Sequence, residues 1–165
     1  MAKIYISLGS SIKRKYHVQQ GILALANAFS MPVTALSLSS LFESEAVGFE
    51  GKTFYNMVVG LNCEQSVEEV ASILREIEFS YGRPAQAKKC SPRTLDLDLL
   101  LYDDLIINEP AQLPRDEISK NAFVLWPLSE VAPELTHPIL NVSYATLWQN
   151  YNKQSQKLNI IPNCW

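Results

Sequence analysis

FYNMVVGLNCEQSVEEVASILREIEFSYGRPAQAKKCSPRTLDLDLLL, residues 54–101, carries in succession the patterns of a strand, a helix and a second strand. Phe54–Cys63 and Leu95–Leu101 are short runs rich in apolar, β-branched and aromatic residues, which favour strands. Between them, Ser66 and Glu69 have the spacing of a capping box, and apolar residues then recur every three or four positions as far as Gly82. The stretch therefore predicts a β-α-β unit.

The residues before this stretch predict a second unit of the same kind. Ile4–Leu8 predicts a strand closed by a turn at residues 9–11, and the apolar spacing within Val18–Phe29 predicts one face of a helix. Residues 33–47, rich in Val, Leu, Phe, Ser and Thr, predict one extended strand. The order over residues 3–101 is thus β-α-β-β-α-β, the split arrangement of ferredoxin-like folds. The expected fold class is α+β, an antiparallel sheet with helices packed on it.

The C-terminal third predicts further elements added to this core. Asn121 is placed to cap a short helix that Pro127 limits, Tyr144–Tyr151 predicts a last helix, and Leu158–Ile161 predicts an edge strand. No repeat, low-complexity segment or internal linker interrupts the chain, so residues 1–165 are expected to form one domain.

Composition narrows the class of protein. The chain has 165 residues, 47% hydrophobic and 19% charged, with a net charge of −3, which is ordinary for a globular protein and argues against a general nucleic-acid binder. Three cysteines without a CxxC spacing suggest neither a disulfide framework nor a zinc site. No apolar run is long enough for a signal peptide or a membrane span. We expect a cytoplasmic monomer that acts on small molecules, with no nucleic-acid or membrane partner.

Two aspartates in the last predicted strand of the core give the strongest chemical signal. In a strand, Asp96 and Asp98 point to the same face with Cα atoms about 6.6 Å apart, while Leu95, Leu97 and Leu99 point to the other face, into the core. Paired carboxylates suit Mg²⁺, which prefers one or two carboxylates together with substrate phosphates and water. The alternative is a solvated polar face on an edge strand.

The segment before these aspartates adds positive charge. It holds four cations and no acidic residue within eleven positions: Arg83, Lys88, Lys89 and Arg93. A phosphate ligand would explain both the four cations and the paired aspartates, because cations bind anionic oxygens directly and carboxylates bind them through a metal. Such a segment could close over a nucleotide as a lid. The alternative is a solvated basic loop.

Three other residues give weaker signals. Glu78 is either a third carboxylate of the site or a surface partner of Arg75. Asn56 offers an amide suited to the edge of a heterocycle, or is a turn residue. Phe123 is either a core residue or flanks a flat ligand.

Several motifs together resemble one enzyme family over nearly the whole chain. They are YISLGSS, FYNMVV, IEFSYGR, SPRTLDLDLLLY and LPRDEI with NAFVLWPLSEVAPELTHP. This set resembles 6-hydroxymethyl-7,8-dihydropterin pyrophosphokinase, which transfers the pyrophosphoryl group of ATP to a pterin alcohol in folate synthesis and releases AMP.

The resemblance implies a ferredoxin-like αβα fold and two Mg²⁺ ions held by Asp96 and Asp98, with ATP as a substrate. It implies catalytic roles for these aspartates and for Arg83 and Arg93, which would stabilise the transferring oxygens. The residues it implies for ATP are Glu78, Lys88, Lys89, Leu99 and Arg115, and those for the pterin are Ser44, Val47, Phe54, Asn56 and Phe123.

The chain also differs from the family's usual pattern. Ser11 stands where Asn is usual, a tryptophan near Cys90 and an arginine near Asn121 are missing, and Arg115 replaces a histidine. A catalytically altered relative is therefore one alternative to the enzyme, and a ferredoxin-like small-molecule binding module is another. An RNA-binding module would need basic residues in the aromatic strand motif, which FYNMVVG lacks.

Overall fold

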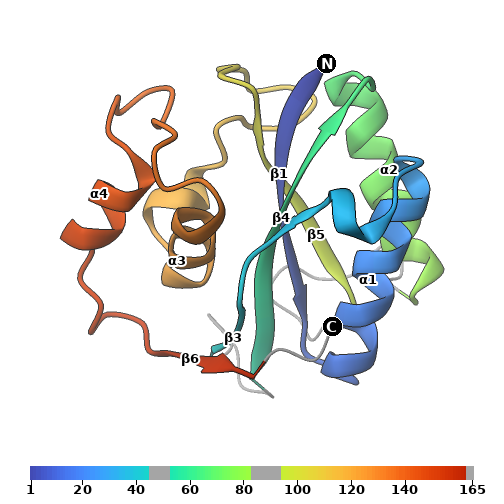
Figure 1. The fold of residues 1–165 in the computed structure, drawn as a ribbon, viewed down its shortest axis with the longest axis horizontal. Helices are drawn as coiled ribbons and strands as arrows, with labels where there is room; N and C mark the ends of the chain where they lie inside the picture. Colours follow the sequence, from blue (N-terminus) through green and yellow to red (C-terminus); the bar gives the residue numbers. More distant parts are fainter. Residues whose placement is uncertain (45–52, 83–93, 163–165) are drawn as a thin grey trace.

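The computed structural model describes residues 1–44, 53–82 and 94–162, and these form three layers (Figure 1). A central antiparallel sheet lies between two helices on one face and two on the other. The fold is α+β, with a ferredoxin-like core, as the sequence predicts. The strands are β1 (Ala2–Ser10), β2 (Ser37–Leu38), β3 (Leu41–Ser44), β4 (Phe54–Cys63), β5 (Asp96–Tyr102) and β6 (Leu158–Ile161). The helices are α1 (Arg14–Ala28), α2 (Val67–Ser80), α3 (Ala122–Val131) and α4 (Tyr144–Asn150), with short 3₁₀ turns η1 (Val33–Ala35) and η2 (Asp116–Ser119).

The sheet has the strand order β5-β1-β4-β3-β6, and β2 also pairs with β4. Every pairing is antiparallel, and the inner strand β1 runs beside β4 over its whole length. β5 is an edge strand, so one row of its backbone groups faces away from the sheet. The two β-α-β units thus interleave their strands, as in a ferredoxin-like core.

One core lies between the sheet and the helices α1 and α2. Leu97 and Leu99 of β5 contribute to it, together with Leu8 of β1 and Leu25 of α1, all at most 4% exposed. α2 starts at the predicted capping box: the Ser66 hydroxyl accepts from the Glu69 amide at 3.2 Å, and the Glu69 carboxylate accepts from the Ser66 amide at 3.0 Å. These leucines fix which way β5 presents its other side chains.

A second core lies on the opposite face, beneath α3 and α4. Tyr5, Val58 and Leu100 of the sheet pack there against Leu125 and Leu128 of α3. Because side chains alternate along a strand, Asp96 and Asp98 share the face of Leu100. The candidate site therefore lies on the α3–α4 side of the sheet.

Two local predictions are wrong. Residues 33–44 do not form one strand, because η1 follows Pro32 and the pairing with β4 is interrupted at Ser39, whose hydroxyl accepts from the Val58 amide at 2.9 Å. α3 continues through Pro127 to Val131, because its buried apolar residues hold it against the sheet. Among the described residues, no helix is both long and apolar enough to cross a membrane.

Candidate active site

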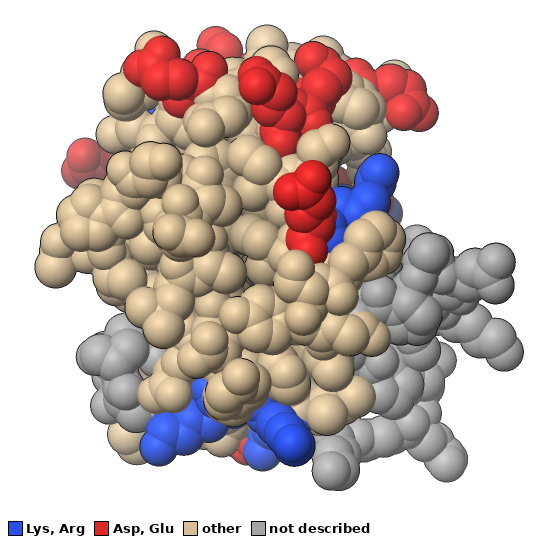
Figure 2. Space-filling model, turned by 90° about the vertical axis from the view of Figure 1, so that its right-hand side faces the viewer, with Lys and Arg blue, Asp and Glu red and all other residues tan. Residues whose placement is uncertain are grey.

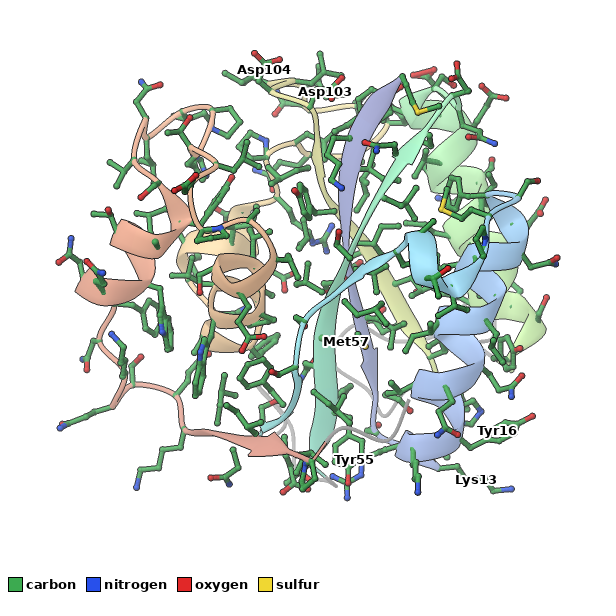
Figure 3. All side chains as sticks on the ribbon, in the orientation of Figure 1. Lys13, Tyr16, Tyr55, Met57, Asp103 and Asp104 are labelled. Carbon is green, nitrogen blue, oxygen red and sulfur yellow. The ribbon has the colours of Figure 1, made fainter. Side chains whose placement is uncertain are left out.

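One row of residues across the sheet assembles the centre of the site. Gly9 of β1 pairs with Asn56 of β4 on one side and with Asp96 of β5 on the other. Residues directly opposite one another in a ladder point to the same face. A carboxylate and an amide therefore flank a position that has no side chain. Tyr55 and Met57 of β4 mark this end of the sheet, and Asp103 and Asp104 mark the other (Figure 3).

The amide side of this row is tightly built. Asn56, 9% exposed, donates from Nδ2 to the Ser44 hydroxyl at 2.7 Å. This bond orients the amide and leaves its oxygen without a hydrogen bond to any described residue. A Cβ at Gly9 would lie 3.0 Å from that oxygen and 3.8 Å from the Phe54 ring. Glycine thus keeps open the space beside Asn56 and Phe54.

The carboxylate side of the site meets a guanidinium. A terminal nitrogen of Arg115 lies 3.4 Å from Oδ1 of Asp98, and the same nitrogen donates to Glu117 at 3.1 Å. Nε of Arg115 also donates to Glu117, at 3.3 Å. Arg115 therefore bridges a carboxylate of β5 and a carboxylate of η2.

The backbone around Arg115 explains its position. Its amide donates to the Leu100 carbonyl at 3.0 Å, and Ile118, fully buried, anchors the turn that follows. Burial alone would lower the pKa of the guanidinium, but the carboxylates of Asp98 and Glu117, and also Asp96, raise the pKa above its ordinary value. The arginine is held charged beside the paired aspartates.

Glu78 reaches the same strand from the last turn of α2. Glu78 is 6% exposed, and its Oε2 accepts a hydrogen bond from the Leu97 amide at 2.9 Å. Leu97 lies between the two aspartates in the sequence. This bond satisfies a backbone donor on the open edge of β5. The residue is not the surface partner that its sequence position also allowed.

The other predicted site residues lie as follows. Leu99 is 4% exposed in the core beneath α1 and α2, on the opposite face of β5 from the aspartates, so only its backbone is placed to contact a ligand on their face. Phe123 of α3 is partly buried against the second core, on the face of the site. Five predicted residues lie outside the described residues and stay predictions: Val47, Arg83, Lys88, Lys89 and Arg93.

Two residues of this arrangement were missed in the sequence. The sequence predicts Gly9 as part of a closing turn, yet β1 runs on to Ser10. A glycine inside a strand often marks a close approach, so the signal was present. Glu117 carried no signal, because its role depends on the side-chain direction of Arg115.

The donor set of the site fits a magnesium ion. Asp96 and Asp98 offer two carboxylates on one face of one strand, the number that Mg²⁺ takes from a protein when phosphates and water supply the rest. Within residues 1–44, 53–82 and 94–162, no three histidine, cysteine or acidic side chains form a closed metal-binding group. Two carboxylates leave the remaining ligand positions of such an ion to phosphates and water.

Charge is unevenly distributed over the molecule. On the face formed by α1 and α2, acidic side chains gather at the upper end, while basic ones lie at the lower end and at one place in the upper half (Figure 2). Lys13 lies at the lower end, the end of Tyr55 (Figure 3). An open cavity of about 590 Å³ lies there, lined by Lys13, Arg14, Lys15, Tyr16 and Tyr55. The site lies on the other side of the sheet but at this same lower end, which is the more basic end of the α1–α2 face.

Together, the fold and the two aspartates of the edge strand β5 define a ferredoxin-like α+β protein with a two-carboxylate site. The sequence model of the 7,8-dihydro-6-hydroxymethylpterin-pyrophosphokinase (HPPK) family matches residues 5–133. The chain belongs to this family.

Known relatives agree with this membership. The chain is 30% identical over 142 residues to a 2-amino-4-hydroxy-6-hydroxymethyldihydropteridine pyrophosphokinase of Aquifex aeolicus, with 84% of this chain and 86% of the relative covered. It is 32% identical over 140 residues to the enzyme of that name from Pseudomonas aeruginosa, covering 82% and 84%.

Longer proteins contain a similar unit. A folic acid synthesis protein of Pneumocystis carinii is 30% identical over 88% of this chain, which spans only 20% of that protein. A crystal structure of Plasmodium falciparum HPPK-DHPS with pteroate has a TM-score of 0.70 and 13% identity, over 93% of this chain and 43% of that one. At that identity the structural likeness supports the fold alone.

Proposed function

We propose that this protein transfers the pyrophosphoryl group of ATP to 6-hydroxymethyl-7,8-dihydropterin and releases AMP. The observation that carries the proposal is the row of Asp96, Gly9 and Asn56 across three strands. It sets a carboxylate suited to a phosphate-bound metal beside an amide suited to a heterocycle. Membership of the pyrophosphokinase family supports the same reaction.

The heterocycle side of the site provides recognition. The oriented amide of Asn56 offers an oxygen that can accept from an N–H group of a pterin, and Ser44 fixes its direction. Phe54 borders the same space, and Phe123, partly buried against the second core on this side of the sheet, would flank the pterin ring. We include Val47 in this pocket on the strength of its place in the sequence alone.

The phosphate side of the site provides charge. Asp96 and Asp98 would hold Mg²⁺, and two such ions would neutralise the triphosphate and orient it. Arg115 is the described cation beside these aspartates, and its planar fork suits phosphate oxygens. We add Arg83, Lys88, Lys89 and Arg93 as phosphate-binding side chains. We also place Glu78 and Leu99 on the nucleotide side of the site.

Little covalent chemistry is required of the protein itself. The hydroxymethyl oxygen attacks the β-phosphorus, and the bond from that phosphorus to the AMP oxygen breaks. Catalysis of such a transfer rests mainly on positioning and on stabilising charge. Rigid placement of the two ends of the site, on paired strands β1, β4 and β5, supplies the positioning.

One assay tests the proposal. The protein is incubated with ATP, Mg²⁺ and the hydroxymethyl dihydropterin, and the nucleotide products are separated by chromatography. We expect AMP in amounts equal to the pterin diphosphate, and no AMP when either the pterin or Mg²⁺ is omitted. Release of ADP would contradict pyrophosphoryl transfer. Tight binding of both ligands without AMP would indicate the altered relative or a binding module instead.

We extend the proposal to the setting of the protein. Residues 1–165 would form one domain that acts as a monomer in the cytoplasm, where ATP is available and the free, buried thiol of Cys63 stays reduced. Light scattering after size exclusion tests the oligomeric state, and a mass near 18.6 kDa is expected.

A further inference from the structure

We infer that Arg115 is a built-in counter-ion of the metal site: its guanidinium competes with a divalent cation for Asp98, and the phosphates of the nucleotide relieve that competition. The inference rests on the proposed function only through the choice of Asp96 and Asp98 as metal ligands. It assigns Arg115 a role before the nucleotide binds, and it assigns Glu117 a positioning role.

The distances place the competition on one carboxylate. The guanidinium nitrogen is 3.4 Å from Oδ1 of Asp98, and the two side chains are only 30% and 25% exposed. Between charges this close and partly shielded from water, the interaction is stronger than between surface groups. A divalent cation on Asp98 would be repelled by this positive charge, or would have to displace it.

Glu117 limits how far the guanidinium can move. Its carboxylate accepts from both Nε and a terminal nitrogen of Arg115. Its other oxygen accepts from Nδ2 of Asn121 at 3.4 Å, and Oδ1 of Asn121 accepts from Gln156 at 3.0 Å. A chain of hydrogen bonds thus fixes Glu117, and Glu117 keeps the guanidinium beside Asp98.

A polyphosphate changes this balance because it offers the guanidinium another partner. Arginine binds phosphate oxygens through two parallel donors, and such charge-assisted bonds are among the strong ones. Once Arg115 turns to the phosphates, its positive charge no longer opposes the cation on Asp98. By linkage, nucleotide and metal then each strengthen the binding of the other.

Titration with Mn²⁺ alone, without nucleotide, tests this competition directly. The electron paramagnetic resonance signal of free Mn²⁺ gives the fraction bound. We expect Arg115→Met to bind Mn²⁺ roughly 5- to 30-fold more tightly than the unmodified protein, within the usual range of coupling between sites. Arg115→Lys keeps the charge and should stay within about threefold of the unmodified protein.

Lys120→Met is the matched control. Lys120 lies in the same segment and pairs with Asp116 at 2.5 Å, with 65% of its side chain exposed. Lys120→Met removes one positive charge, as Arg115→Met does, but at a place away from Asp96 and Asp98. The Mn²⁺ affinity of Lys120→Met should therefore equal that of the unmodified protein. Adding Asp98→Asn to Arg115→Met should abolish the gain. Circular dichroism and thermal unfolding identify misfolded variants, and Arg115→Gln replaces Arg115→Met if that one fails to fold.

The outcomes separate this inference from the proposed function. Equal Mn²⁺ affinities for the unmodified protein and Arg115→Met, or an equal gain in Lys120→Met, would overturn the inference even if the unmodified protein makes AMP. A gain confined to Arg115→Met would support the inference, and would do so even if no AMP were formed and the proposed function failed.

Discussion

Arg115 contacts carboxylates on two elements, Asp98 on β5 and Glu117 on η2, and the proposed function makes it a ligand for ATP as well. We predict that Arg115→Ala weakens binding of a non-hydrolysable ATP analogue by about 1.5–3 kcal/mol, the range for a hydrogen bond to a charged group. Calorimetry at saturating Mg²⁺ measures this loss, because competition at Asp98 no longer contributes there.

Pterin affinity is the internal control for that variant. Asn56 and Phe54 lie across β1 from Asp98 and are untouched, so a pterin titration should give nearly the same affinity in both proteins. A loss confined to the pterin titration, or no loss in either, would show that Arg115 does not face the nucleotide.

The two aspartates give a second prediction at this scale. Asp96→Asn and Asp98→Asn keep the size and strand register but remove a charged oxygen. We expect each to lower kcat by roughly 10²–10³-fold, as for the loss of one group that stabilises transition-state charge. The double variant should fall by much less than the product of the two, because the pair acts as a unit. Near-full Mg²⁺-dependent activity in both single variants would exclude the metal site.

Gly9 permits a prediction about the pterin alone. In Gly9→Ala, the new Cβ would lie 3.0 Å from Oδ1 of Asn56, so the amide must shift and its hydrogen bond to the ligand weakens. We expect pterin affinity to fall by roughly fivefold, about the worth of one neutral hydrogen bond. Mn²⁺ affinity should not change, since Asp96 and Asp98 keep their positions. Unchanged pterin affinity would remove Asn56 from the pocket.

The sequence was informative about site residues whose role depends on strand alternation. It placed Asp96 and Asp98 on one face and their neighbouring leucines in the core, and the structure agrees. It could not show that Arg115 reaches Asp98, because that contact joins a loop to a strand through the direction of one long side chain. The basic residues before Asp96 stay predictions.

At the scale of whole elements, regular periodicity made most of the core predictable. The strands β1, β4 and β5 and both helices of the core came from apolar spacing and a capping box. The prediction failed between Pro32 and Ser44, where the Ser39 side chain replaces a backbone partner of Val58. A side-chain hydrogen bond of this kind leaves the hydrophobic pattern intact, so the pattern shows one strand where the structure has two.

The tie between α2 and β5 gives the prediction at this scale. Glu78→Ala removes the acceptor of the Leu97 amide and leaves a buried donor unsatisfied. Urea denaturation should show a loss of about 1–3 kcal/mol in the free energy of unfolding. Glu78→Gln keeps an acceptor oxygen and should lose less. Equal losses in the two variants would mean that the carboxylate charge, rather than the hydrogen bond, stabilises this junction.

At the scale of the whole molecule, the net charge of −3 is the same in sign as that of ATP. The unequal distribution of charge resolves this conflict, since basic side chains gather at the end of the α1–α2 face where Lys13 lies (Figure 2). A positive region attracts an anionic ligand over distances that salt shortens to about 10 Å at 0.1 M. The neutral pterin gains nothing from it.

Ionic strength therefore separates the two substrates. Between about 50 and 500 mM KCl, at constant free Mg²⁺, we expect the KM for ATP to rise roughly three- to tenfold through screening, while the KM for the pterin changes little. Lys13→Gln with Lys15→Gln should flatten the ATP dependence, since these side chains line the basic cavity. Lys3→Gln, at the opposite end of β1, is the matched control and should leave the dependence as it is. A pterin KM that rises as steeply as that of ATP would mean that salt acts on the fold rather than on attraction of the nucleotide.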